Sequence, residues 1–192
     1  MQWAGPVGVV TAGMPAPAPR QSLWSWSLRA LEVPEARGAL LALQDGHGLN
    51  GSLMLWAAWC DRAGLALTDA EATRIVGRIH EMDRYVVRRL REVRRYVDAP
   101  RPGYDRAALS ALRAEAYRTE LMGEQLIQAR LQEETLATCA LGARPGTGAR
   151  LARACARALE TPVIMADDRG AAGPVALFAT LLAHAPPLNE AE

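Results

Sequence analysis

The feature that most constrains the fold is a helical repeat of apolar residues between Asp69 and Val97. Successive apolar residues are separated by three or four positions, so they lie along one side of a single helix. The repeat consists of Ile75, Ile79, Met82, Val86, Leu90, Val93 and Val97. Thr68 and Glu71 form a capping box that predicts where this helix begins. At ~1.5 Å per residue, the helix is about 40 Å long.

A second long helix is predicted beyond Pro100–Gly103, because two prolines and a glycine break the first one. Asp105 can cap this helix, and its apolar pattern reaches about Leu141. The pattern consists of Leu109, Leu112, Ala116, Met122, Leu126, Ile127 and Leu131. Two long helices joined by a tight break fold back on each other. We therefore expect an antiparallel hairpin with both apolar stripes inside.

Three shorter helices are predicted before this pair. Ser22 and Asn50 can each accept hydrogen bonds at a helix start, and Pro34 suits the first turn of a helix. Gly46 and Gly64 are placed to end the second and third of these helices. The chain is therefore predicted to be all-α, with a bundle of short helices packed on a long antiparallel helical hairpin.

The composition changes along the chain and predicts its organisation. Residues 1–21 are rich in alanine and proline, which predicts a disordered leader. Residues 22–142 contain the helical domain, and residues 143–192 are expected to be loop and short helices packed on the same domain. This last segment is expected to hold helices over residues 149–159 and 174–184 and an extended stretch over residues 163–165.

The overall composition excludes several classes of protein. A net charge of +1 gives no global attraction to nucleic acid or to acidic lipid. The three cysteines show no CxxC spacing, so the chain predicts neither a disulfide framework nor a thiolate zinc site, and it suits a reducing cytoplasm. No segment approaches the ~18 apolar residues that a membrane span requires. We expect no cofactor and no metal.

Tryptophans and polar residues gather around one predicted turn. The candidate pocket consists of Trp24, Trp26, Gln44, Asp45, His47, Asn50, Trp56 and Trp59. A carboxylate beside an imidazole can orient it for proton transfer, and tryptophan rings can line a cleft. Turn and cap hydrogen bonds explain the same polar residues, and core packing explains Trp24 and Trp56. Both interpretations stay open, with Trp26 or Trp59 as the ring that reaches a ligand or partner.

The same region resembles a known family. The segments Ser22–Leu28, Leu41–Asn50 and Leu53–Trp56 combine a Ser/Trp helix, an LQD turn with glycines, and a leucine-rich tryptophan helix. In that order they resemble the proteobacterial domain of unknown function 2390, and the resemblance extends from about Ser22 to Gln132. It implies a small, soluble, helical protein, and it brings no enzymatic activity with it.

Arginines line part of the first long helix. Arg84, Arg88, Arg91 and Arg95 are spaced by four, three and four positions and form a candidate interaction stripe. Such a stripe can follow phosphates or an anionic surface. The glutamates of the second long helix can instead meet it across the hairpin or in an oligomer, and a charged helix face of this kind fits the near-zero net charge.

No complete catalytic motif is present: GxSxG, a Walker-type loop and GxGxxG are all missing from the sequence. Cys60 on the tryptophan helix is expected to be a buried, unreactive thiol. We therefore expect a cytoplasmic, non-enzymatic interaction or adaptor module that binds a protein partner or itself. The alternatives are a small-molecule binder or enzyme with a tryptophan-lined cleft around Asp45 and His47, and a weak nucleic-acid binder that uses the arginine stripe.

Overall fold

The computed structural model describes residues 21–141, 147–158 and 173–188. The predicted leader up to residue 20 and the predicted extended stretch 163–165 lie outside these ranges. Apart from one pair of two-residue strands, the regular structure in the described ranges is helical, which confirms the all-α prediction. No described helix combines the length and the apolar character needed to cross a bilayer.

The amino-terminal part forms short helices, as predicted. They are α1 (Leu23–Glu32), α2 (Pro34–Leu41), the π-helical turn η1 (Ala42–Gly46) and α3 (Gly51–Arg62). The Ser22 hydroxyl accepts the Ser25 N–H, and the Asn50 side-chain oxygen accepts the Leu53 N–H at 3.0 Å. The predicted caps are therefore confirmed, because each satisfies a backbone donor that the first helical turn leaves open.

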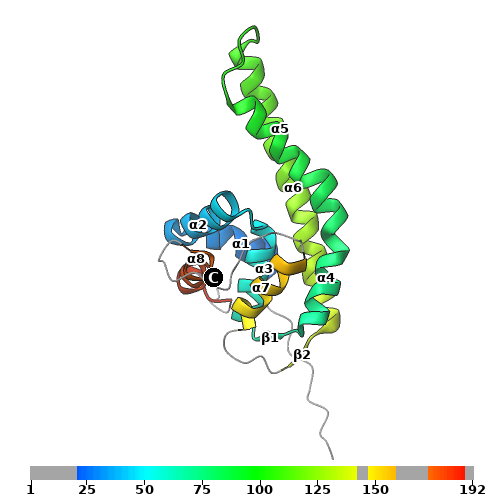
Figure 1. The fold of residues 1–192 in the computed structure, drawn as a ribbon. Helices are drawn as coiled ribbons and strands as arrows, with labels where there is room; N and C mark the ends of the chain where they lie inside the picture. The colour runs from blue at the N-terminus through cyan, green and yellow to red at the C-terminus, as the bar shows by residue number, and fades with distance from the viewer. Residues whose placement is uncertain (1–20, 142–146, 159–172, 189–192) are drawn as a thin grey trace, which may run out of the picture.

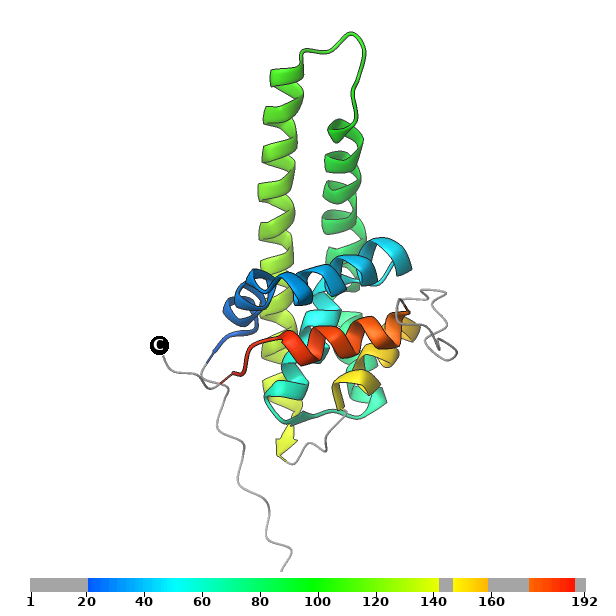
Figure 2. The same cartoon turned by 90° about the vertical axis from the view of Figure 1, so that its left-hand side faces the viewer.

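The hairpin projects beyond this bundle (Figures 1 and 2). Its first arm is continuous through α4 (Asp69–Met82), the π-turn η2 (Asp83–Val87) and α5 (Arg88–Asp98), and its second arm is α6 (Arg106–Thr138). The capping box at Thr68 and the Asp105 cap are both present. The two arms run side by side in opposite directions, and α5 packs against α6.

The carboxyl-terminal helices pack on the bundle. Helix α7 (Thr147–Ala158) lies against α3 and α4, and α8 (Pro174–His184) lies against α2. Strand β1 (Leu65–Ala66) pairs antiparallel with β2 (Ala140–Leu141), which joins the end of α6 to the connection between α3 and α4. The core between these elements contains Trp26, Trp56 and Trp59, all fully buried.

The π-turn η2 changes which side of the first arm faces α6. Up to Ile79 the predicted apolar stripe is buried, but Asp83 and Val87 then take the inward positions in place of Met82 and Val86. A π-turn adds one residue to a helical turn, so later side chains are rotated relative to the regular pattern. The single inward stripe predicted for Asp69–Val97 is therefore wrong at Met82, Val86 and Val93, which are exposed, whereas Leu90 is half-buried and Val97 is buried.

The predicted stripe of α6 also needs correction. Ala116, Ile127 and Leu131 are buried, whereas Leu112, Met122 and Leu126 are exposed. Glu120 and Gly123 occupy the inward positions instead. Gly123 allows close approach of the arms, because a β-carbon there would lie 2.8 Å from Cγ2 of Val87.

We predict that Gly123→Ala destabilises the fold by about 1–3 kcal/mol, since Val87 is buried and stiff about its first torsion. Gly77→Ala is the matched control, because Gly77 lies on the exposed side of α4 with no atom near its added β-carbon. That control should stabilise the fold by about 0.5–1 kcal/mol. Urea unfolding of both variants measures the difference, and equal stability of the two would contradict the close approach.

Candidate functional site

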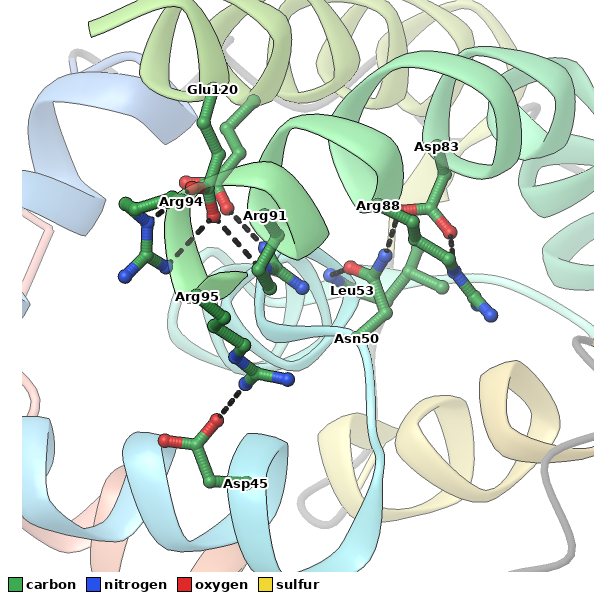
Figure 3. A network of polar contacts seen from close by, with 10 residues as sticks. Asp45, Asn50, Leu53, Asp83, Arg88, Arg91, Arg94, Arg95 and Glu120 are labelled. Atoms are coloured by element: carbon green, nitrogen blue, oxygen red, sulfur yellow. Dashed lines mark hydrogen bonds and ion pairs between the residues drawn. The ribbon is translucent and has the colours of Figure 1, made fainter. Parts of the chain in front are cut away.

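A buried carboxylate joins the bundle to the hairpin (Figure 3). Asp83 is fully buried; its Oδ1 accepts the Asn50 amide N–H at 2.6 Å, and its Oδ2 accepts the Arg88 guanidinium at 2.7 Å. Since the side-chain oxygen of Asn50 caps α3 while its amide N–H binds Asp83, this one residue both begins the tryptophan helix and ties it to η2. The turn between η1 and α3 is thereby held against the first arm.

Beside this contact, two arginines of α5 turn inward toward α6. Arg91 donates to Glu120 at 2.8 Å and to Glu124 at 2.6 Å, and Arg94 donates to Glu120 at 2.6 Å (Figure 3). The Arg91 side chain is only 12% exposed, and Glu120 is buried. Two arginines thus meet two glutamates, so the cluster has no net charge.

The two glutamates have pKa values that move in opposite directions. Burial alone would raise the pKa of Glu120, but hydrogen bonds from Arg94 and Arg91 outweigh it and hold that pKa below the usual value. Burial raises the pKa of Glu124, and its contact with Arg91 does not reverse the effect. Glu120 is therefore the firmly ionised member of the cluster.

This cluster forms part of the wall of a cleft of about 450 Å³. The cleft lies between the amino-terminal helices on one side and α5 and α6 on the other, with the start of α3 between them. Its lining is Trp24, Ser27, Leu28, Leu31, Arg37, Leu40, Leu41, Gln44, Gly51, Ser52, Leu55, Arg94, Tyr117, Glu120, Leu121, Glu124 and Gln128. The volume falls within the range typical of small-molecule sites.

Two polar atoms in this lining are buried without a partner in the described part of the protein: Ser27 Oγ and Gln128 Oε1. Buried polar atoms in folded proteins are almost always hydrogen-bonded. Trp59 Nε1 is also unpartnered, but it lies in the core and outside the cleft. The cleft therefore combines apolar walls with two polar groups that have no partner in its lining.

The comparisons with known proteins identify a family. A family model described as "Protein of unknown function (DUF2390)" matches residues 22–131. The chain belongs to this family. Comparison with curated proteins and with solved structures found no match. The matched segment contains both sides of the cleft and the whole Asp83 contact, so the resemblance seen in the sequence is confirmed and these features lie within the family's own region.

The structure separates the residues of the predicted candidate pocket. Trp24 and Gln44 line the cleft, whereas Asp45 and His47 do not. Asp45 forms an ion pair with Arg95, and His47 is half-buried. The prediction that Asp45 and His47 line the tryptophan cleft is therefore wrong for this cleft.

The remaining candidate-pocket residues belong to the core and the cap. Trp56 Nε1 donates to Thr135 at 2.8 Å and Trp26 Nε1 donates to the Pro186 carbonyl at 2.9 Å, while Asn50 caps α3. The assignment of Trp26 or Trp59 to a surface contact is wrong, because both rings are fully buried. Trp24, for which a place in the pocket and a place in the core were both left open, is the half-buried ring that reaches the cleft.

The predicted arginine stripe does not form an open row. Arg88 pairs with Asp83, Arg91 with the glutamates of α6, and Arg95 with Asp45. The guanidinium of Arg84 lies 5.5 Å from the ring centre of Tyr85. Three of these four arginines thus bind carboxylates of the same chain.

The sequence analysis missed Ser27, Arg94, Glu120 and Gln128 as residues of the cleft. Ser27 left a faint signal, since it lies one turn beyond the buried Leu23 on an amphipathic helix. Arg94 and Glu120 left a partial signal: the expected pairing of arginines with glutamates across the hairpin is present, but regular helical spacing places apolar neighbours inward in their stead. The π-turn that brings them inward has no mark in the sequence.

The described residues offer little for covalent or metal chemistry. Burial raises the pKa of the Cys60 thiol well above its usual value, so Cys60 is the unreactive buried thiol that the sequence predicted. No three His, Cys, Asp or Glu side chains of the described ranges gather as a metal site would require.

We predict that Glu120→Gln lowers the free energy of unfolding by about 3 kcal/mol at pH 7, because it leaves the largely buried Arg94 without a carboxylate and Arg91 with Glu124 alone. The control is Glu115→Gln, whose pair with Arg118 is exposed and should contribute within about 0.5 kcal/mol. Urea titration measures both. Equal losses would show that the buried cluster contributes no more than a surface pair.

The difference in stability between the wild type and Glu120→Gln should depend on pH. Because the folded pKa of Glu120 lies below the unfolded one, its stabilisation is complete above the ordinary glutamate pKa of about 4.3 and is lost as pH falls through the lowered value. The difference in the free energy of unfolding between wild type and Glu120→Gln should therefore decrease as the pH is lowered. A difference in unfolding free energy that grows at acid pH would contradict the lowered pKa of Glu120.

We also predict that Asn50→Asp destabilises the fold by about 3 kcal/mol at pH 7. Aspartate caps a helix as well as asparagine does, so the loss arises from placing a second carboxylate against the buried Asp83. Ser22→Asp is the control, since Ser22 is an exposed cap and should change stability by less than about 0.5 kcal/mol. If thermal unfolding shows the same loss of stability for both variants, the contact between Asp83 and Asn50 does not hold the bundle to the hairpin.

Proposed function

We propose that this protein is a non-enzymatic interaction module that docks through the apolar side of its hairpin. The side chains concerned, called the outer face here, are Met82, Val86, Val93, Leu112, Met122 and Leu126. Their exposed fractions lie between 37% and 65%. The proposal rests on one observation: these apolar side chains recur at the spacing of a buried helical stripe, yet they are exposed in the single chain.

The members of the outer face lie on one side of the hairpin. On α6, Met122 and Leu126 are one turn apart, and Leu112 lies on the same flank nearly three turns earlier. The Cγ1 atom of Val86 lies 3.9 Å from the β-carbon position of Gly123, the residue that follows Met122 on α6. Tyr117, Leu121 and Gln128 on the other flank of α6 face the cleft. The outer face and the cleft are thus on opposite flanks.

We infer that the occupant of the outer face is a second copy of the chain. The hairpin is a single layer of helices, and an apolar face of one layer is stable only when another layer covers it. A second hairpin supplies an identical apolar face, and two paired hairpins resemble a four-helix bundle.

The charges beside the outer face do not oppose this pairing. Arg89 pairs with Glu92, and Arg118 pairs with Glu115, so these exposed charges are paired within each copy. The net charge of +1 leaves little repulsion between copies. All three cysteines are free, which agrees with the cytoplasm as the compartment that we propose.

The test is the oligomeric state of Met122→Glu combined with Leu126→Glu. The wild type should sediment as a dimer at tens of micromolar, and the double variant should dissociate at least about 100-fold more readily, because each dimer would bury four carboxylates. Val175→Glu is the control, since Val175 is an exposed apolar residue of α8. It should leave the dimer intact.

Circular dichroism checks that both variants keep the helical content of the wild type. A wild type that is monomeric at tens of micromolar would overturn pairing of the outer face with a second copy. A double variant that remains dimeric would place the contact on another surface.

A further inference from the structure

The cleft behind Trp24 carries an inference of its own, separate from the outer face. We propose that it binds a neutral, largely apolar small molecule that carries one N–H or O–H donor. The proposal combines the shape of the cleft, its charge balance and its two unpartnered polar atoms.

The walls of the cleft determine the body of the ligand. Leucines from α1, α2 and α3 face Tyr117 and Leu121 of α6, and the ring of Trp24 completes the apolar lining. A space of about 450 Å³ with such walls suits a compact molecule of one or two rings or a short branched chain. Burial of its apolar surface would supply most of the binding free energy.

The charges in the wall determine that the ligand is neutral. Arg94 is bound by Glu120, and Glu124 is bound by Arg91, so the inner wall offers no unpaired charge. Arg37 stands at the exposed rim and donates its Nε to the Leu31 carbonyl at 2.6 Å. An anionic group placed deeper in the cleft would meet two glutamates and the oxygen of Gln128. A cation would have to compete with the arginines already paired there.

The unpartnered atoms determine the polar group of the ligand. Ser27 is 1% exposed and Gln128 is 2% exposed, and both line the cleft. The Leu23 N–H donates to Gln132 at 2.7 Å, and each of these residues is one turn from Ser27 or Gln128, so both unpartnered atoms lie where α1 meets α6. Gln128 Oε1 can only accept a hydrogen bond, which requires a donor on the ligand.

Reaching this oxygen requires only a small movement. The terminal torsion of a glutamine side chain is soft, so the carboxamide can rotate to present Oε1 to the cleft. The Ser27 hydroxyl rotates freely and can either donate or accept. A ligand with one donor therefore satisfies Gln128, and Ser27 adapts to whichever polar atom lies next to it.

The test uses three probes that share one skeleton. N-phenyl-1-naphthylamine is neutral with one N–H, 1-benzylnaphthalene replaces that N–H by CH₂, and 1-anilinonaphthalene-8-sulfonate adds an anionic group. The first probe should bind the full-length chain saturably, with enhanced fluorescence. The other two probes are measured by their displacement of the first. The CH₂ analogue should bind about 5–10-fold more weakly, which is the loss expected for one hydrogen bond. The sulfonate should bind more weakly still.

Two variants assign the binding to the cleft. Leu121→Trp fills the space and should weaken the first probe at least about 10-fold. Its control is Leu136→Trp, the same change on an exposed part of α6 outside the cleft. Gln128→Leu should abolish the preference for the N–H probe over its CH₂ analogue. It should not reduce the free energy of unfolding, because the oxygen it removes has no partner in the described fold.

Each opposite result overturns the proposal. Absence of a saturable fluorescence rise would show that the cleft holds water only. Equal affinity for the N–H and CH₂ probes in the wild type would remove the role of Gln128. Tightest binding of the sulfonate, lost in Arg37→Gln, would make the ligand an anion held at the rim. Equal effects of Leu121→Trp and Leu136→Trp would place the probe elsewhere.

Discussion

The rest of the structure depends on the buried carboxylate of Asp83. A buried charge is stable only when donors replace the water it has lost, and here Asn50 and Arg88 provide them. Because Asn50 also caps α3, the same contact attaches the tryptophan helix to the long first arm. It does so in η2, the turn at which that arm changes the side it presents to α6.

That change of side links the two surfaces proposed here. Rotation of the helix brings Arg91 and Arg94 inward to Glu120, and Arg94 and Glu120 form part of the cleft wall. The same rotation leaves Val86 and Val93 uncovered on the opposite flank. The polar inner contact and the part of the apolar outer face that lies on the first arm are therefore two consequences of one π-turn, and π-turns inside α-helices are often found at functional sites.

Much of the secondary structure was predictable, because its signals are local. Ser22, Asn50, Thr68 and Asp105 each cap the helix that follows, through hydrogen bonds to residues three positions away. The candidate site was less predictable. Trp24 and Gln44 were found, but Ser27, Glu120 and Gln128 were missed, and Trp26 and Trp59 proved to be core. Periodicity shows which residues share a side of a helix, and it does not show which neighbour that side meets.

The sequence by itself determined the all-α class, the capped helix starts and the break between the long helices, since caps, prolines and apolar spacing act within a few residues. Only the tertiary structure decided which side of each long helix is buried. That choice rests on pairs such as Asn50 with Asp83 and Arg91 with Glu120, which are 33 and 29 positions apart. Contacts over such separations form when the chain folds, and they can override a regular pattern because an unpaired buried charge costs more than an exposed valine.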